Sequence, residues 1–226
     1  RMNAVEDGDA NMMGAPYNRI GLRECLEVAR NHEHYKSAVA DGAGRGVAMG
    51  YWINAGMQSS ATLNVIADGH VAILTGSPDI GGSRASMALM ASEVLGIPFE
   101  QIHPQVAATD AVGHTDLTGG SRTTLATGQA VIQAAEQCVA ELCRRAAAEW
   151  EVEPGVVTWS QGAAHYGDQS LTFEELASRA GAMGGPLTFS SSLSSTSTAP
   201  GFGVHICDAE VDKETGRTTI TRYTAI

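Results

Sequence analysis

The sequence has little positive charge and no cluster of basic residues. Its 226 residues include 14 Lys and Arg against 25 Asp and Glu, which gives a formal net charge of −11 at pH 7. Phosphate backbones and anionic membranes attract concentrated basic side chains, so neither nucleic acid nor a membrane is an expected partner. No apolar run approaches the length of about 18 residues that a membrane span needs, and no secretory leader opens the chain. We therefore expect a soluble protein.

Cysteines are also few. Four are present, without a CxxC pair, and they are Cys25, Cys138, Cys143 and Cys207. This usage favours free thiols in a reducing compartment, so we predict a cytoplasmic protein without an iron–sulfur or zinc site in this segment. The seven histidines show neither HxxxH nor HExxH spacing. We assign no metal ligand and no catalytic residue.

The apolar pattern predicts an α+β fold, in which helices pack on a mixed β-sheet. Two short apolar runs, 63–66 and 71–74, flank Asp68-Gly69 and predict a β-hairpin. Helical spacing predicts three helices. The first covers about residues 22–33, the second runs from an N-cap at Ser83 to Gly96, and the third, which is the longest, follows the loop that ends near residue 124 and reaches about residue 150. A short helix is expected from about 172 to 181, and the Ser- and Thr-rich segment 189–200 is predicted to be a loop. Further strands are expected at about 102–108, 156–159, 163–166, 202–211 and 218–224.

The glycine cluster at 42–46 precedes an apolar run and is interpreted as a flexible connector into a strand. A dinucleotide-binding loop is a weak alternative, because no strand precedes the glycines and no helix follows them. We predict a connecting segment with a short helix over residues 1–46, and a second region over residues 47–226. The last residues continue an alternating pattern, so we expect the closing strand to extend in a longer protein.

A strand, a glycine-rich loop and a helix start occur together twice, at 72–86 and at 104–124. The first turn of a helix has N–H groups without intrahelical partners, and glycine lets a ligand approach the backbone. Gly81-Gly82-Ser83 and the segment 119–123 are therefore binding candidates, and Arg122 can add a charge-assisted bond to a phosphate. The alternative, that these glycines only end the strands, stays open. A Walker loop is excluded, because the sequence contains no GxxxxGK[ST].

The same residues carry a resemblance to a known family. Residues 75–83, TGSPDIGGS, followed by EVLGIP at 93–98, resemble the T-G-x-x-D-[IM]-G-Q-G … A-E-x-L-G-I-P segment of the molybdenum hydroxylases, the xanthine dehydrogenase and aldehyde oxidase family. Residues 118–131 resemble that family's second loop and long helix, and residues 203–216 resemble its A-E-V-x-V-D-x-x-T-G hairpin. The likeness covers nearly the whole chain. One difference is Gly82, where the family usually has Gln.

The resemblance implies that residues 47–226 are part of the second molybdopterin-binding half of a large subunit, truncated at its C-terminal end. It places pterin contacts at Ile80, Gly81, Gly82, Gly120, Ser121 and Thr123. Arg122 would then meet the diphosphate of a cytosine dinucleotide form of the cofactor. The implied base, a glutamate in a Gly-rich motif, lies beyond this chain, so we expect the isolated segment to bind no cofactor and to be inactive.

The resemblance also implies the activity and partners of the full-length protein. It would hydroxylate an aldehyde or a purine-like N-heterocycle with oxygen from water, while iron–sulfur and FAD centres lie on other domains or subunits. Expected partners are the rest of the subunit, those electron-transfer partners, a small-molecule substrate and a second copy, because open strand edges favour self-association. The alternative is a non-catalytic structural or interaction module that has lost cofactor binding, which Gly82 in place of Gln makes conceivable.

Overall fold

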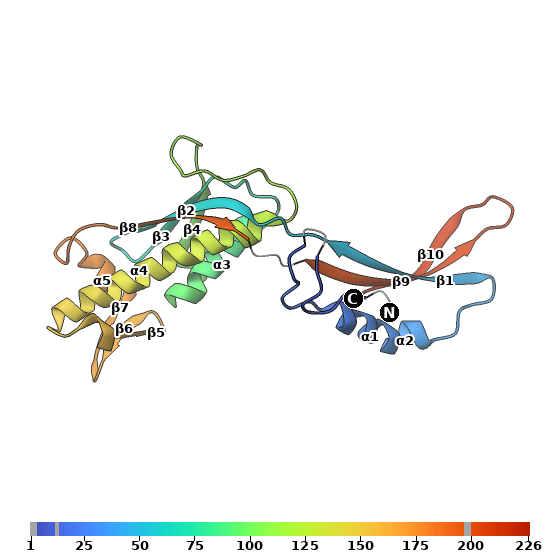
Figure 1. Ribbon diagram of the computed structural model, residues 1–226, viewed down its shortest axis with the longest axis horizontal. Coiled ribbons are helices and arrows are strands. Elements are labelled where there is room, and N and C mark those ends of the chain that lie inside the picture. Colours follow the sequence, from blue (N-terminus) through green and yellow to red (C-terminus); the bar gives the residue numbers. More distant parts are fainter. Residues whose placement is uncertain (1–3, 12–13, 197–199) are drawn as a thin grey trace. The chain divides into compact units, whose positions relative to one another are not determined.

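The computed structural model describes residues 4–11, 14–196 and 200–226. Internal contacts divide the chain into a terminal unit, residues 1–54 and 198–226, and a central unit, residues 55–197 (Figure 1). Across the described ranges, every helix is too short or too polar to cross a membrane. The domain boundary predicted between residues 46 and 47 stays a prediction.

The terminal unit is an antiparallel sheet with two helices. Its strand order is β1-β9-β10, with bounds Ala43–Trp52, Gly201–Val211 and Thr218–Ala225. Helix α1 (Leu22–Asn31) packs on β9, where Val204 and Ile206 are fully buried, and α2 (Glu33–Lys36) follows it. The predicted helix and both closing strands are confirmed. The interpretation of the glycine cluster at 42–46 as a flexible connector is wrong, because β1 begins inside this cluster and pairs with β9 from Ala43 onward.

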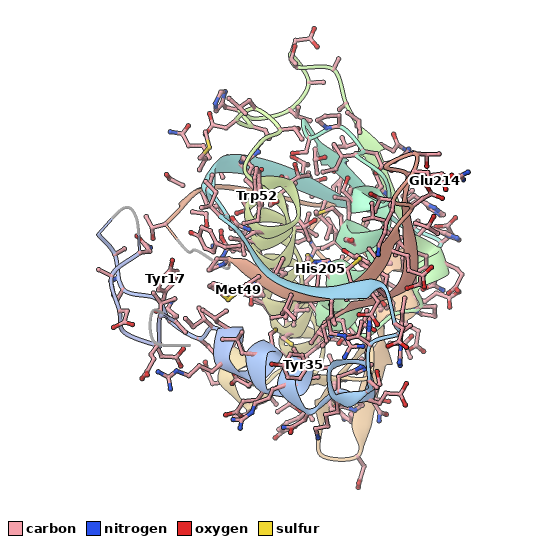
Figure 2. All side chains as sticks on the ribbon, turned by 90° about the vertical axis from the view of Figure 1, so that its right-hand side faces the viewer. Tyr17, Tyr35, Met49, Trp52, His205 and Glu214 are labelled. Carbon is pink, nitrogen blue, oxygen red and sulfur yellow. The ribbon has the colours of Figure 1, made fainter. Side chains whose placement is uncertain are left out.

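The apolar core of the terminal unit is small. Figure 2 shows Met49 and Trp52 on β1, and their side chains are 54% and 62% exposed. A polar cluster adds to the core, because Arg45 donates two hydrogen bonds of 2.7 Å to the carboxylate of Asp208. The fully buried ring of His34 lies against the same carboxylate, 3.2 Å from its Oδ2. Arg45, with a smaller contribution from His34, lowers the pKa of Asp208 to about 2.

The central unit contains the mixed sheet that the sequence predicts. Its strand order is β4-β3-β2-β8; β3 and β4 are parallel, and the other neighbours are antiparallel. The bounds are Met57–Val65 for β2, Val71–Thr75 for β3, Ile102–Val106 for β4 and Leu187–Ser195 for β8. Helices α3 (Ser83–Leu95) and α4 (Gly128–Glu149) pack on one face of this sheet and bury the main apolar core (Figure 1). The α+β fold class is confirmed.

Short elements complete the central unit. A three-stranded antiparallel sheet, β5 (Thr158–Ser160), β6 (Ala163–Tyr166) and β7 (Gln169–Thr172), leads into α5 (Phe173–Ser178). Thr172 and Glu175 form a capping box at the start of α5. Single turns lie at Phe99–Gln101 (η1), Pro154–Val156 (η3) and, with π-helical geometry, Thr123–Thr127 (η2).

Two predictions in the central unit are wrong. The segment predicted as a loop over 189–200 is the strand β8 as far as Ser195, and residues 197–199 lie outside the described ranges. Ser83 is the first residue of α3 and not its N-cap; that position belongs to Gly82, in the left-handed conformation at φ 99°. The predicted hairpin is confirmed as β2 paired with β3.

Candidate functional site

Both predicted binding segments lie at one edge of the mixed sheet. Strands β3 and β4 run parallel, with Thr75 beside Val106, so their carboxyl ends share that edge. From there the first loop (residues 76–82) leads into α3, and the second loop (residues 107–122) leads into η2 and α4. The loops touch, because a Cβ built on Gly76 would lie 3.5 Å from the Cβ of Thr115. The structure thus brings the two segments together.

The helices behind the loops are also held close. A Cβ built on Gly128, at the start of α4, would lie 2.5 Å from the Sδ of Met90 in α3, so the two helices approach closely at this point. The Oγ1 of Thr127 is 2.8 Å from the Oγ of Ser77 in the first loop and 2.8 Å from the Oγ of Ser59 in β2. All three hydroxyls belong to buried residues. The two helix starts therefore form one packed assembly with the end of the sheet.

The tip of the first loop is open to solvent. Ile80 is 60% exposed, and a Cβ built on Gly81 or Gly82 would meet no heavy atom within 4 Å. Their φ angles of 107° and 99° are favourable only for glycine. These positions accept the close approach of a flat ligand.

The amides of the first loop, however, already have an acceptor. The Oδ1 of Asp79 accepts hydrogen bonds from the N–H groups of Gly81, Gly82 and Ser83 at 3.1, 2.8 and 3.0 Å. Arg84 donates to Oδ2 at 2.8 Å, and this contact, followed by the amide bonds, holds the pKa of Asp79 well below its usual range. The carboxylate thus occupies the place predicted for a ligand anion at this helix start. The expectation that these amides are free is corrected.

The second loop ends in an unusual backbone. Gly120, at φ 64°, accepts a hydrogen bond from the N–H of Ala55, and a Cβ there would lie 2.9 Å from the Cβ of Ala55. The exposed Ser121 also has a positive φ, 55°, which is uncommon for a residue with a side chain. Thr123 opens the π-helical turn, and its Oγ1 is buried and has no hydrogen-bond partner among the described residues. A buried hydroxyl normally has a partner, so this atom fits a ligand group.

Arg122 lies inside the protein and not at the surface. Its side chain is fully buried, and its Nε, Nη1 and Nη2 donate to the backbone carbonyls of Gly56, Asp116 and Gln58 at 3.0, 3.0 and 2.5 Å. Burial lowers its pKa from the ordinary value. The guanidinium ties the second loop to the beginning of β2. A diphosphate contact does not fit this geometry, and Arg122 therefore leaves the set of candidate ligands.

The sequence reasoning missed three residues of this assembly. Asp79 had a signal, because an Asp shortly before a helix commonly caps its first amides. Ser59 and Thr127 had none, because their contact joins residues 68 positions apart. Among the residues that the structure describes, no group of three or more His, Cys, Asp or Glu side chains is arranged to hold a metal ion.

Comparisons with known proteins identify the family of the chain. The model of a family described as "Molybdopterin cofactor-binding domain" matches residues 22–226. The chain is 32% identical over 154 residues to xanthine dehydrogenase of Drosophila subobscura, a match that covers 61% of this chain and 12% of that protein. It is 33% identical over 117 residues to xanthine dehydrogenase of Calliphora vicina, covering 51% of this chain and 8% of that protein.

Solved structures share the fold. Quinoline 2-oxidoreductase from Pseudomonas putida 86 superposes with a TM-score of 0.82 at 18% identity, over 96% of this chain and 32% of that chain. A Cu,Mo-CO dehydrogenase superposes with a TM-score of 0.75 at 24% identity, over 81% of this chain and 26% of that chain. The chain thus spans about an eighth or less of the curated relatives that it matches and about a third or less of these structures.

Proposed function

Because the chain belongs to the molybdopterin cofactor-binding domain family, we propose that it supplies pterin-binding loops to a molybdenum-dependent oxidoreductase. In this proposal the full-length protein hydroxylates an aldehyde or a purine-like N-heterocycle with oxygen from water. The observation that carries it is the meeting of two glycine-containing loop-to-helix junctions at one edge of the mixed sheet. Ligands of α/β folds bind at the carboxyl ends of strands for the same geometric reason.

The residues present can contact a pterin with hydroxyl groups and with an exposed apolar side chain beside open space. Free backbone amides contribute less. Ser121 is exposed at the loop end, and the unpartnered Oγ1 of Thr123 lies at the start of the helical turn that follows. Ile80 offers an exposed apolar side chain to a ring face, while Gly81 and Gly82 leave room beside it. The cofactor, when bound, supplies the redox chemistry at its molybdenum; this chain binds and orients the pterin.

The remaining parts of the proposal concern the longer protein. Residues 47–226 belong to the second molybdopterin-binding half, and iron–sulfur and FAD centres lie elsewhere in the enzyme. The sequence contains no GxGE segment that would carry a base glutamate, so we predict that the 226 residues alone are inactive. We also predict that they bind no cofactor on their own. The cytoplasmic location, the cytosine dinucleotide form and self-association stay predictions. For the dinucleotide form, Arg122 is no longer the proposed diphosphate ligand.

The contacts of Asp79 are compatible with the non-catalytic alternative as well. Asp79 occupies the amides of the first loop, so a negatively charged cofactor group cannot use them without displacing this carboxylate. A structural module that has lost its cofactor would show the same contacts. The two functions differ in whether the full-length protein contains molybdenum and pterin.

The test measures molybdenum by elemental analysis and pterin by fluorescence in the purified full-length protein. Ser121→Leu should lower both by about fivefold or more, which corresponds to about 1 kcal/mol of binding free energy. Gln161→Leu is the matched control, because Gln161 is also exposed and has a positive φ, 50°, but lies in the turn between β5 and β6. Wild-type protein without either component would support the non-catalytic alternative. Equal contents in the two variants would remove Ser121 from the site.

A further inference from the structure

We propose that Thr127 is a positioning residue of the cofactor site, whose buried hydroxyl fixes the first loop against the helix start that follows the second. The inference rests on the proposed function and adds a residue that does not itself touch the cofactor. The side chain of Thr127 has no exposed surface. Its Oγ1 lies 2.8 Å from Ser77 and 2.8 Å from Ser59.

The two hydrogen bonds of Thr127 can form independently of each other. A threonine hydroxyl has one proton and two lone pairs, so Thr127 can donate to one serine and accept from the other, or accept from both. Ser59 and Ser77 are 1% and 6% exposed, so water has little access to replace either bond. A buried hydroxyl without a partner loses its hydration without compensation. Each bond is therefore retained in the folded protein, and the bond to Ser77 can persist when Ser59 is replaced.

The backbone at Thr127 is also unusual. Thr127 closes the π-helical turn Thr123–Thr127, and such turns are rare and frequently lie at functional sites. The next residue, Gly128, is in contact with Met90 of α3. The hydrogen bonds of Thr127 and the close approach of α3 to α4 thus lie at the same point. A small displacement of α4 there would move both loops.

This arrangement connects the two proposed sets of ligand contacts. Ser77 is three residues before Ile80 in the same loop, and Thr123 is four residues before Thr127 in the same turn. The bond from Thr127 to Ser77 therefore determines how the tip of the first loop lies relative to the hydroxyl of Thr123. The bond to Ser59 instead anchors the helix start to β2, away from the first loop.

The two partners allow a matched test in the full-length protein. Ser77→Ala removes only the bond to the first loop, and Ser59→Ala removes only the bond to β2; both bonds have the same length, and both serines are buried. Molybdenum and pterin content are measured for each variant together with the thermal midpoint. We expect Ser77→Ala to lower the cofactor content about tenfold, in the range found when residues behind a metal ligand are removed. Ser59→Ala, with a similar thermal midpoint, should stay within about twofold of the wild type.

Variants at Thr127 itself complete the experiment. Thr127→Val removes both bonds at nearly constant volume and should reproduce the loss of Ser77→Ala, whereas Thr127→Ser keeps the hydroxyl and should restore the cofactor content. Amide hydrogen exchange over residues 79–83 should accelerate in Ser77→Ala but not in Ser59→Ala.

Three outcomes would contradict the inference. Equal cofactor loss in the two alanine variants would show that the hydrogen bonds of Thr127 only stabilise the fold. Full cofactor content in Ser77→Ala would exclude the positioning role while leaving the proposed function intact. Wild-type protein without molybdenum and pterin would instead overturn the proposed function itself, and the inference with it.

Discussion

Replacing Arg122 by methionine should destabilise the central unit strongly, although the residue has a charged side chain. Methionine matches the length of the aliphatic stem but removes the guanidinium donor from the carbonyl oxygens of Gly56, Gln58 and Asp116. Each buried polar group without a partner costs about 1–3 kcal/mol. Removing the buried charge returns part of its desolvation cost. The carbonyl of Gln58 keeps a donor, because it also accepts from the N–H of Asp116 at 3.1 Å. Taking about 1 kcal/mol for each of the other two carbonyls, we expect the free energy of unfolding to fall by about 2 kcal/mol.

The measurement is urea unfolding followed by tryptophan fluorescence. Trp150 and Trp159 belong to the central unit and Trp52 to the terminal unit, so a Trp52→Phe background reports on the central unit alone. With a slope of about 1–3 kcal/mol per molar urea, the loss corresponds to a midpoint lower by about 1 M. Arg122→Lys should recover only part of the loss, because an ammonium does not reproduce the planar fork of the guanidinium.

Arg84→Met is the matched control for this prediction. Arg84 has a side chain that is 56% exposed and makes one ion pair, with Asp79. Exposed pairs contribute about 1 kcal/mol or less. If Arg122→Met unfolds at the same urea concentration as Arg84→Met, the carbonyl contacts of Arg122 do not stabilise the second loop and our interpretation of its burial is wrong.

Three further predictions follow from other sites. Gly96→Ala should destabilise the central unit by about 2 kcal/mol or more in urea unfolding, because φ is 70° and its Cβ would clash with the backbone of Gly162; Gly167→Ala, at φ 56° with open space, should cost only about 1 kcal/mol. Asp208 has a folded pKa of about 2 against 3.8, so its stabilisation is present above pH 4 and is lost as the pH falls toward 2; hydrogen exchange of β9 should show this acid dependence in the wild type and not in Asp208→Asn. Burial raises the pKa of Cys138 to about 12, so iodoacetamide at about pH 8 should leave it unmodified in native protein, and mass spectrometry showing rapid alkylation would contradict this.

The sequence predicts the elements whose patterns are local. The hairpin of β2 and β3 follows from two apolar runs around Asp68-Gly69, and α1 and α4 follow from helical spacing. Strand β8 was missed because serine occupies most of its positions, including the buried Ser191. The alternation of burial along β8 is visible only once it pairs with β2, since Leu187, Phe189 and Leu193 then mark its inner face.

The sequence predicts two glycine-containing junctions, because each follows a strand and precedes a helix, and the structure places both at one edge of the sheet. Their role in binding stays a prediction, and their contacts are not predictable from the sequence. Composition cannot show that the guanidinium of Arg122 points inward, since arginine is rarely buried without tertiary partners. Those partners are carbonyls of β2 and its lead-in, 64 and 66 residues earlier in the chain.

The parallel pairing of β3 and β4 explains why the proposed cofactor site lies at this edge of the sheet and not at the opposite one. Strand β3, helix α3 and strand β4 form a crossover unit, so α3 starts where β3 ends, and α4 starts beyond the end of β4. Two helix starts therefore meet at one edge, while the antiparallel neighbour β2 contributes Ser59 and the carbonyl groups that hold Thr127 and Arg122. Asp79 neutralises the first helix start from within, whereas Thr123 leaves an unpartnered hydroxyl at the second. Because of this difference, we expect the second loop to supply most of the hydrogen bonds to the ligand and the first loop to supply only apolar contact and space. Substitutions at Ser121 should therefore lower cofactor content more than conservative changes at Ile80.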